Sequence, residues 1–347
     1  MTGKILHHRL FLCPAVILIV LTLACLILPA AALTVTDDTG FVVSFNDTPQ
    51  RIVSFSPANT EILAALGLAD RIVGLTDACD FPPEIKDKQK IGGFSSISLE
   101  KVAAAKPDLV VAAHLTPPGT VSRLRDLGIP VVVLAPGNID DMVKDIRMVG
   151  EITGTNDWAE TLVGNLNRRL SAVSPVPESA SRPVVAHVVW HDPLYVSGNG
   201  TLQNEVIVRA GGINAFAGRN GWVTVSLEEF RSINPDIILV NGGNGMGRKG
   251  SDVILETFRN DPRYAALTAV REGHIYAVDA DIISRPGPRI VDATEQLARL
   301  IHPECFTQAT TTPGAIPTTP VKSPGFCAGS ALLLISLIIL PRGGRKN

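Results

Sequence analysis

The stretch Arg51-Ile52-Val53-Ser54-Phe55-Ser56-Pro57 joins a short apolar run to a helical pattern, Thr60-Glu61-Ile62-Leu63-Ala64-Ala65-Leu66, which Gly67 ends. An apolar run of this length that ends at a Ser-Pro turn is typical of a buried strand. Similar runs follow at residues 108–113 and 130–134. Strands that alternate with helices predict a mostly parallel sheet with right-handed crossovers. We therefore expect an N-terminal α/β lobe over residues 33–138.

The second half of the chain repeats this alternation. Apolar runs at residues 183–190, 236–240 and 274–278 predict strands, and residues 202–210 predict a helix that ends before two glycines. We therefore expect a second α/β lobe over residues 175–306.

The segment between the lobes, residues 139–174, contains no strand pattern. Its apolar side chains recur near helical spacing, and Gly150 and Gly154 are positions at which a helix can bend. The predicted fold is therefore α/β, with two Rossmann-like lobes and mostly parallel sheets joined by one long α-helix.

One short motif occurs once in each lobe. Ser98-Leu99-Glu100 lies nine residues before Pro107-Asp108, and Ser226-Leu227-Glu228 stands at the same distance before Pro235-Asp236. Each motif predicts a Ser-capped helix with an acid in its first turn, followed by a strand. Two interpretations remain open. The repeat is either a recurrent helix–strand unit, or a pair of acidic docking positions on two equivalent lobes.

Composition and charge exclude two classes of protein. The chain has 347 residues, with 31 Lys and Arg against 33 Asp and Glu, so its charge gives no case for a nucleic-acid partner. A hydrophobic fraction of 46% excludes a disordered protein. Cys79 and Cys305 are the cysteines of the expected folded part, and the sequence leaves open whether they pair.

The first 32 residues are typical of a secretory signal peptide. Basic residues precede an apolar run at residues 10–28, and Ala30-Ala31-Ala32 offers a cleavage site. A retained membrane anchor is the alternative.

The C-terminal end carries a second signal. Residues 307–323 form a Thr/Pro tract that predicts an extended stalk. Residues 324–347 contain Pro324-Gly325-Phe326, a short apolar stretch and a basic tail, which together resemble the archaeal C-terminal sorting signal. That resemblance implies cleavage and a lipid anchor, and a simple tail anchor is the alternative. We expect a secreted, cell-surface protein that is membrane-anchored on the outer face.

Several motifs occur in the order of a known family. Ser56-Pro57-Ala58-Asn59-Thr60-Glu61 is followed by Asp80-Phe81-Pro82-Pro83, Ile91-Gly92-Gly93 and Pro288-Arg289-Ile290. This order resembles the cobalamin-binding and iron-siderophore-binding proteins of ABC importers. The resemblance implies a class III periplasmic-binding-protein fold with a rigid connecting helix, a ligand held between the lobes, and no enzymatic activity. It also implies a permease dimer with separate ATPase subunits as partners.

Within that family the chain is most similar to the cobalamin binders, through Asp192-Pro193-Leu194-Tyr195-Val196 with Gly198, Gly200 and Asn204. We therefore expect it to capture a corrinoid, cobalamin first, and to need no cofactor. An iron-siderophore or haem ligand is the alternative. Cobalamin binders often carry aromatic residues at positions where this chain has Ala78, Ala113, Ile282 and Ile283.

The resemblance also assigns residues. The positions that match ligand contacts of the family are Pro57, Asn59, Phe94, Trp222, Asp281 and Arg285. Glu100 and Glu228 match glutamates that meet arginines of the two transporter subunits.

Two competing interpretations rest on other residues. His114 and His191 each follow a predicted strand and are candidate ligands for a haem or an iron chelate. A receptor for a free metal ion lacks support, because the motifs HExxH and CxxC are absent. Residues 245–250 spell GxGxxG, the pattern of a secreted dinucleotide-dependent enzyme, but they lie in a loop so rich in glycine that the match carries little weight.

Overall fold

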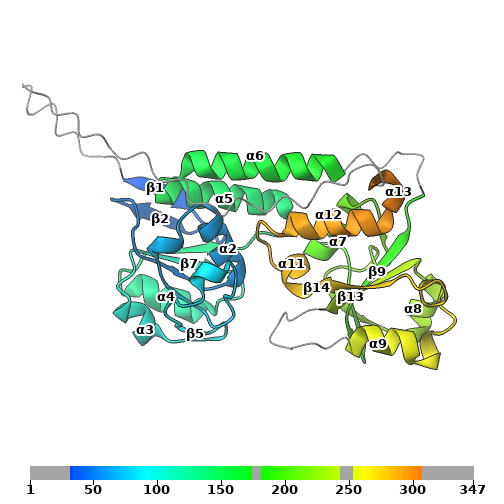
Figure 1. Cartoon of the computed structure of the whole chain (residues 1–347). Helices are drawn as coiled ribbons and strands as arrows, with labels where there is room; N and C mark the ends of the chain where they lie inside the picture. Colours follow the sequence, from blue (N-terminus) through cyan, green and yellow to red (C-terminus); the bar gives the residue numbers. More distant parts are fainter. Residues whose placement is uncertain (1–31, 174–180, 243–252, 307–347) are drawn as a thin grey trace, which may run out of the picture. The chain divides into compact units, whose positions relative to one another are not determined.

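The computed structural model describes residues 32–173, 181–242 and 253–306. Figure 1 shows two α/β lobes, the first in blue to cyan and the second in green to orange. The predicted signal peptide apart from Ala32, the Thr/Pro stalk, the C-terminal anchor and the GxGxxG loop lie outside the described residues. Among the residues described, no helix combines the length and the apolar character needed to cross a membrane.

The N-terminal lobe is built on a parallel sheet with the strand order β4-β3-β7-β8. Its strands are short and almost entirely buried, which explains their continuous apolar sequences. The sheet strands are β3 (Ile52–Ser54), β4 (Ile72–Leu75), β7 (Leu109–Ala113) and β8 (Val131–Leu134). The other elements of this lobe are the hairpin strands β1 (Leu33–Thr36), β2 (Val42–Phe45), β5 (Gly92–Gly93) and β6 (Ser96–Ile97), the helices α2 (Pro57–Ala65), α3 (Leu99–Ala104) and α4 (Pro118–Asp126), and the 3-10 turns η1 (Ala69–Arg71) and η2 (Pro83–Ile85).

The C-terminal lobe has a mixed sheet with the order β12-β10-β9-β13-β14, in which β11 also pairs with β9. β9, β13 and β14 are parallel as predicted. β10 is antiparallel to β9, which it follows through a tight turn, and it is also antiparallel to its other neighbour, β12. The strands are β9 (Val184–His191), β10 (Leu194–Ser197), β11 (Ile213–Asn214), β12 (Trp222–Val225), β13 (Ile237–Gly242) and β14 (Ile275–Asp279).

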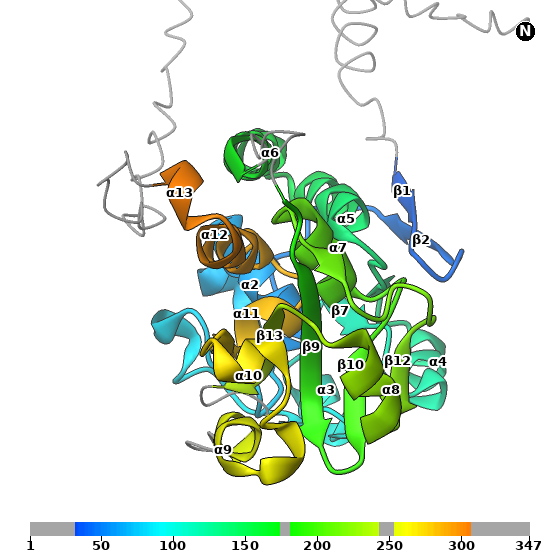
Figure 2. The same ribbon diagram turned by 90° about the vertical axis from the view of Figure 1, so that its right-hand side faces the viewer.

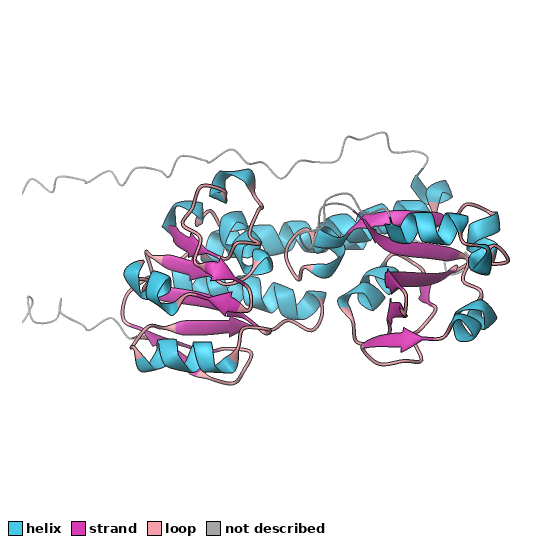
Figure 3. Cartoon of the chain, turned by 90° about the horizontal axis from the view of Figure 1, so that it is seen from below, coloured by secondary structure: helices cyan, strands magenta, loops and turns pink. Residues whose placement is uncertain are grey.

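Helices flank this second sheet, and Figure 3 shows strands layered with helices in both lobes. The helices are α7 (Leu202–Arg209), α8 (Leu227–Ile233), α9 (Val253–Asn260), α10 (Thr268–Arg271), α11 (Ala280–Ser284), α12 (Ile290–Ile301) and α13 (Pro303–Phe306), with the 3-10 turn η4 (Pro262–Tyr264). The α/β prediction is therefore confirmed in both lobes.

The segment between the lobes corrects one expectation, because it forms two helices instead of one. α5 (Ile139–Thr153) ends at Gly154, which adopts the left-handed conformation with φ of 68°, and α6 (Asn156–Val173) turns back along it. Arg147 and Glu160 pair across the two helices at 2.8 Å. α6 then reaches the second lobe, where Arg169 binds two carboxylates of α12.

The two cysteines of the folded part do not form a disulfide in the structure. Cys79 is buried and its thiol contacts the hydroxyls of Thr60 and Thr76. Cys305 lies far along the chain, in the short helix α13. The described part of the protein therefore depends on packing and polar contacts for its stability.

Candidate functional site

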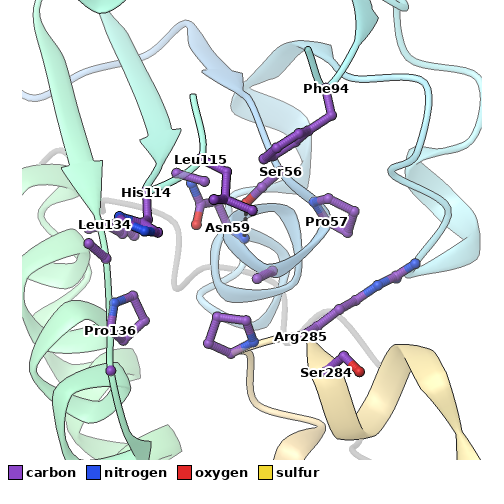
Figure 4. A pocket seen from close by; sticks show the side chains of 15 residues that line it. Ser56, Pro57, Asn59, Phe94, His114, Leu115, Leu134, Pro136, Ser284 and Arg285 are labelled. Carbon is purple, nitrogen blue, oxygen red and sulfur yellow. Dashed lines mark hydrogen bonds between the residues drawn. The ribbon is translucent and has the colours of Figure 1, made fainter. Parts of the chain in front are cut away.

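A cavity of about 480 Å³ lies between the two lobes. The N-terminal lobe contributes the start of α2, the turn between β5 and β6, and the loops that follow β7 and β8. The C-terminal lobe contributes residues 284–286, at the end of α11. The loops after parallel strands meet at the same edge of a sheet, which is where α/β proteins place ligands. Figure 4 shows the side chains that line this cavity.

The structure brings four of the six predicted ligand residues to this cavity. Pro57, Asn59, Phe94 and Arg285 line it. The lining does not include Asp281, whose carboxylate pairs with Arg285 at 2.8 Å. It also does not include Trp222, which is 39% exposed and stacks on Tyr195 with the ring centroids 6.0 Å apart.

The start of α2 is fixed by local polar contacts. Ser56 caps the helix, because its hydroxyl accepts a hydrogen bond from the backbone N–H of Asn59 at 3.2 Å. The Asn59 amide donates to the carbonyl oxygens of Val111 and Ala112 at 3.2 and 2.9 Å. Asn59 therefore ties α2 to the end of β7, and its NH₂ group is already engaged by the protein.

Phe94 stands in the turn of the β5–β6 hairpin, and the glycine before this turn is required. Gly92 has φ of 114°, and a Cβ atom there would lie 2.5 Å from the Ser96 carbonyl oxygen. Only glycine accepts both the backbone conformation and the close approach. The sequence Ile91-Gly92-Gly93 thus places an aromatic ring on the wall of the cavity (Figure 4).

Carboxylates from both lobes surround Arg285. Its guanidinium lies 3.3 Å from Glu61, 2.9 Å from Asp80 and 2.8 Å from Asp281. Figure 4 shows the side chain running from α11 away from the other labelled lining residues. Burial opposes the charge, but the carboxylates overcome it and raise the pKa of Arg285. The aliphatic part of Arg285 therefore lines the cavity, while its charged end joins the two lobes.

Glu61 is the centre of these contacts. It is 3% exposed, and it accepts hydrogen bonds from Arg289 Nε at 3.0 Å and from Arg289 Nη2 at 2.6 Å. Arg289 also lies over the Phe81 ring, 4.0 Å from its centroid. α2 of the first lobe is thus paired with the start of α12 in the second, directly beside the cavity.

The two candidate histidines differ in position. His114 lines the cavity, whereas His191 lies outside its lining. Across the described ranges, no group of three or more histidines, cysteines or acids is arranged to hold a metal ion.

The two glutamates of the repeated motif occupy equivalent positions. Glu100 and Glu228 are each the second residue of a short helix, α3 or α8, that a serine caps. Both are exposed, and neither lines the cavity. Figures 1 and 2 place α3 and α8 on the side of the lobes away from α6.

Sequence reasoning missed several lining residues and the ion pairs. Leu115 and Pro136 follow β7 and β8 directly, so the rule that strand ends form the site could have found them. Glu61 also had a sequence signal, because it directly precedes the apolar run Ile62-Leu63-Ala64-Ala65 of the same helix, and a buried acid needs a cation as its partner.

Comparison with known proteins shows the family. The family model described as periplasmic binding protein matches residues 52–282. The uncharacterized ABC transporter substrate-binding lipoprotein YvrC of Bacillus subtilis is 31% identical over 281 residues, covering 79% of this chain and 86% of that protein. The vitamin B12-binding protein of Vibrio cholerae is 26% identical over 251 residues, covering 72% of this chain and 87% of that protein.

A solved structure agrees with these matches. The periplasmic heme-binding protein RhuT of Roseiflexus sp. RS-1, in apo form, aligns with a TM-score of 0.65 and 28% identity, covering 74% of this chain and 99% of that one. These similar proteins are binding proteins and not enzymes. The chain belongs to the periplasmic binding protein family.

Proposed function

We propose that this protein is the extracellular substrate-binding protein of an ABC importer, and that it captures a corrinoid, cobalamin, between its two lobes. The observation that carries the proposal is the cavity of about 480 Å³ between the lobes, whose lining is mainly apolar and includes the Phe94 ring. A large planar macrocycle buries a ring face against such a wall and needs few polar contacts. Similarity to the vitamin B12-binding protein supports this ligand class.

A haem or an iron chelate is the second candidate. His114 in the cavity favours it, since imidazole is a common ligand of iron, and so does similarity to the heme-binding protein RhuT. All of these ligands are bulky metal complexes, and they share the same route of delivery to a permease dimer with separate ATPase subunits.

Localisation belongs to the same proposal. The basic and apolar start of the chain supports export, and Pro324-Gly325-Phe326 with its apolar stretch supports anchoring on the outer face of the membrane. A receptor held there meets its ligand outside the cell and its permease in the same membrane.

We also propose that Glu100 and Glu228 dock the protein on the permease. Each lobe presents one exposed carboxylate at the same place in a Ser-capped helix. Two equivalent lobes on a two-fold permease need one such anchor each. An arginine of the permease would form a charge-assisted pair with each carboxylate.

We expect the double variant Glu100→Ala/Glu228→Ala to lose most cobalamin uptake while its cobalamin affinity stays unchanged. Each single variant is expected to lose less, because one lobe still docks. Truncating one partner of a desolvated charge pair weakens association by about 2–5 kcal/mol. The measurement is uptake of radiolabelled cobalamin by cells that carry each variant as their only copy, together with the dissociation constant of each purified chain.

Glu229→Ala is the matched control. Glu229 follows Glu228 in α8, and its carboxylate already forms an ion pair with Arg219 of the same chain. Its uptake should equal that of the wild type. Normal uptake in the double variant would show that both glutamates serve only as acidic residues in the first turn of their helices. Loss of cobalamin affinity would instead place them at the ligand site.

A further inference from the structure

The polar side chains of the cavity are nearly all engaged by the protein itself. Ser56 caps α2, and the Asn59 amide is held by the carbonyl oxygens of the β7 end. The Ser284 hydroxyl contacts the Gln203 amide at 3.2 Å. Arg285 is paired with three carboxylates. Each of these four side chains already makes at least one polar contact with the protein itself.

His114 is the exception. Its backbone is fixed, because its N–H donates to the Leu134 carbonyl oxygen at 3.0 Å and the preceding N–H donates to Thr116 Oγ1 at 3.1 Å. Its imidazole makes no hydrogen bond or ion pair with any part of the chain that the structure describes. Figure 4 shows the ring beside Leu134, near Leu115. The cavity therefore offers one uncommitted imidazole on a rigid strand end.

A ligand that covers this imidazole without bonding to it loses binding free energy, because the ring nitrogens lose their contact with water. A macrocycle that fills the cavity removes water from the ring, and a polar group buried without a partner destabilises the complex. The apolar neighbours Leu115, Leu134 and Pro136 supply no partner. A metal at the centre of the macrocycle does, because a neutral imidazole nitrogen is a good ligand for transition metals.

We propose that His114 coordinates the cobalt of the bound corrinoid through a ring nitrogen. The inference rests on the proposed function and names the part of the ligand that is recognised. The Co–N bond forms as an exchangeable water leaves the cobalt. The cobalt keeps its oxidation state, and the imidazole enters as the neutral base, so no proton or electron is transferred. The site then prefers corrinoids that carry an exchangeable axial ligand on the exposed face.

The two forms of cobalamin test this directly, because aquocobalamin carries an exchangeable water where cyanocobalamin carries a tightly held cyanide. The purified full-length chain is titrated with each form while the absorption spectrum is recorded. We expect the wild type to change the spectrum of aquocobalamin, as replacement of water by imidazole does, and to leave that of cyanocobalamin nearly unchanged. Aquocobalamin should bind more tightly by about tenfold or more, a difference well within reach of titration.

His114→Ala should abolish the spectral change and bring the two affinities together. His191→Ala is the matched control, since His191 also follows a strand but lies outside the lining, and it should behave as the wild type. An unaltered spectral change in His114→Ala would overturn the inference and leave the proposed function standing. Failure of the wild type to bind either cobalamin would instead overturn the proposed function, and the inference with it.

Discussion

Glu61→Gln is expected to lower the free energy of unfolding by about 3–5 kcal/mol, the cost of removing one partner of a buried ion pair. The Glu61 carboxylate is nearly inaccessible and receives three hydrogen bonds from Arg285 and Arg289. Glutamine keeps the shape but not the charge, so the largely buried guanidinium of Arg289 loses its carboxylate partner, while Arg285 keeps Asp80 and Asp281. Because these contacts join the lobes beside the cavity, ligand affinity should fall as well. Chemical denaturation of the full-length chain measures the change in stability.

Glu160→Gln is the matched control, since Glu160 also pairs with an arginine but both side chains are exposed. It should unfold at nearly the same denaturant concentration as the wild type. If Glu61→Gln does not fold, Arg289→Lys offers a milder change that keeps the charge and loses the paired hydrogen bonds of the guanidinium. Equal stability of the Glu61, Arg289 and Glu160 variants would show that the ion pairs between the lobes contribute little.

Asp145→Asn is expected to stabilise the protein at pH 8 by about 2–5 kcal/mol and to change its stability little at pH 4. Asp145 is 1% exposed in α5, and one of its oxygens has no partner among the described residues. Burial, together with the nearby charge of Asp38, raises the pKa of Asp145 to about 8. The amide of asparagine can donate to the Asp38 carboxylate, as the protonated acid does.

The direction of this pH dependence follows from proton binding. With a pKa raised to about 8, the folded protein keeps the proton on Asp145 over a pH range in which the unfolded chain has already released it. The contribution of Asp145 is therefore complete below pH 4 and is lost as the pH rises towards 8. Thermal or chemical unfolding of both proteins between pH 4 and pH 8 measures the difference between them.

Asp141→Asn tests whether this gain is specific to the buried acid. Asp141 lies one turn earlier in α5, where a hydrogen bond and the charge of Lys144 lower its pKa despite slight burial. Its replacement should give no gain at either pH. A gain in the Asp141 variant, or a constant difference between Asp145→Asn and the wild type at all pH values, would contradict the account.

The strands β3, β7, β8, β9, β13 and β14 and the helices α2, α3, α7 and α8 followed from the sequence because their signals are local. The run at 108–113 is buried on both faces of a parallel sheet, so it contains apolar residues only, apart from its first. The division of residues 139–173 into two helices did not follow, since both α5 and α6 have helical periodicity. The division depends on how the two helices pack: Gly150 of α5 lies so close to Ala159 of α6 that a Cβ on the glycine would be 2.6 Å from the alanine methyl.

The candidate site was predictable only in part, for a related reason. Pro57 and Phe94 lie in turns with their own sequence signals, a helix start and a glycine pair. Two of the three carboxylate partners of Arg285, Glu61 and Asp80, are residues of the other lobe, more than 200 positions away along the chain. The sequence therefore predicted a ligand contact for Arg285, which lines the cavity, but not that its charged end also links the two lobes.

Calorimetric titration of the purified full-length chain with cobalamin, cobinamide, haemin and ferric siderophores, under the same conditions, distinguishes the proposed ligand from its alternatives. We expect saturable binding of cobalamin at one site, with a lower dissociation constant than that of haemin or any ferric siderophore. Absence of binding to either corrinoid, together with tight binding of an iron complex, would contradict this expectation.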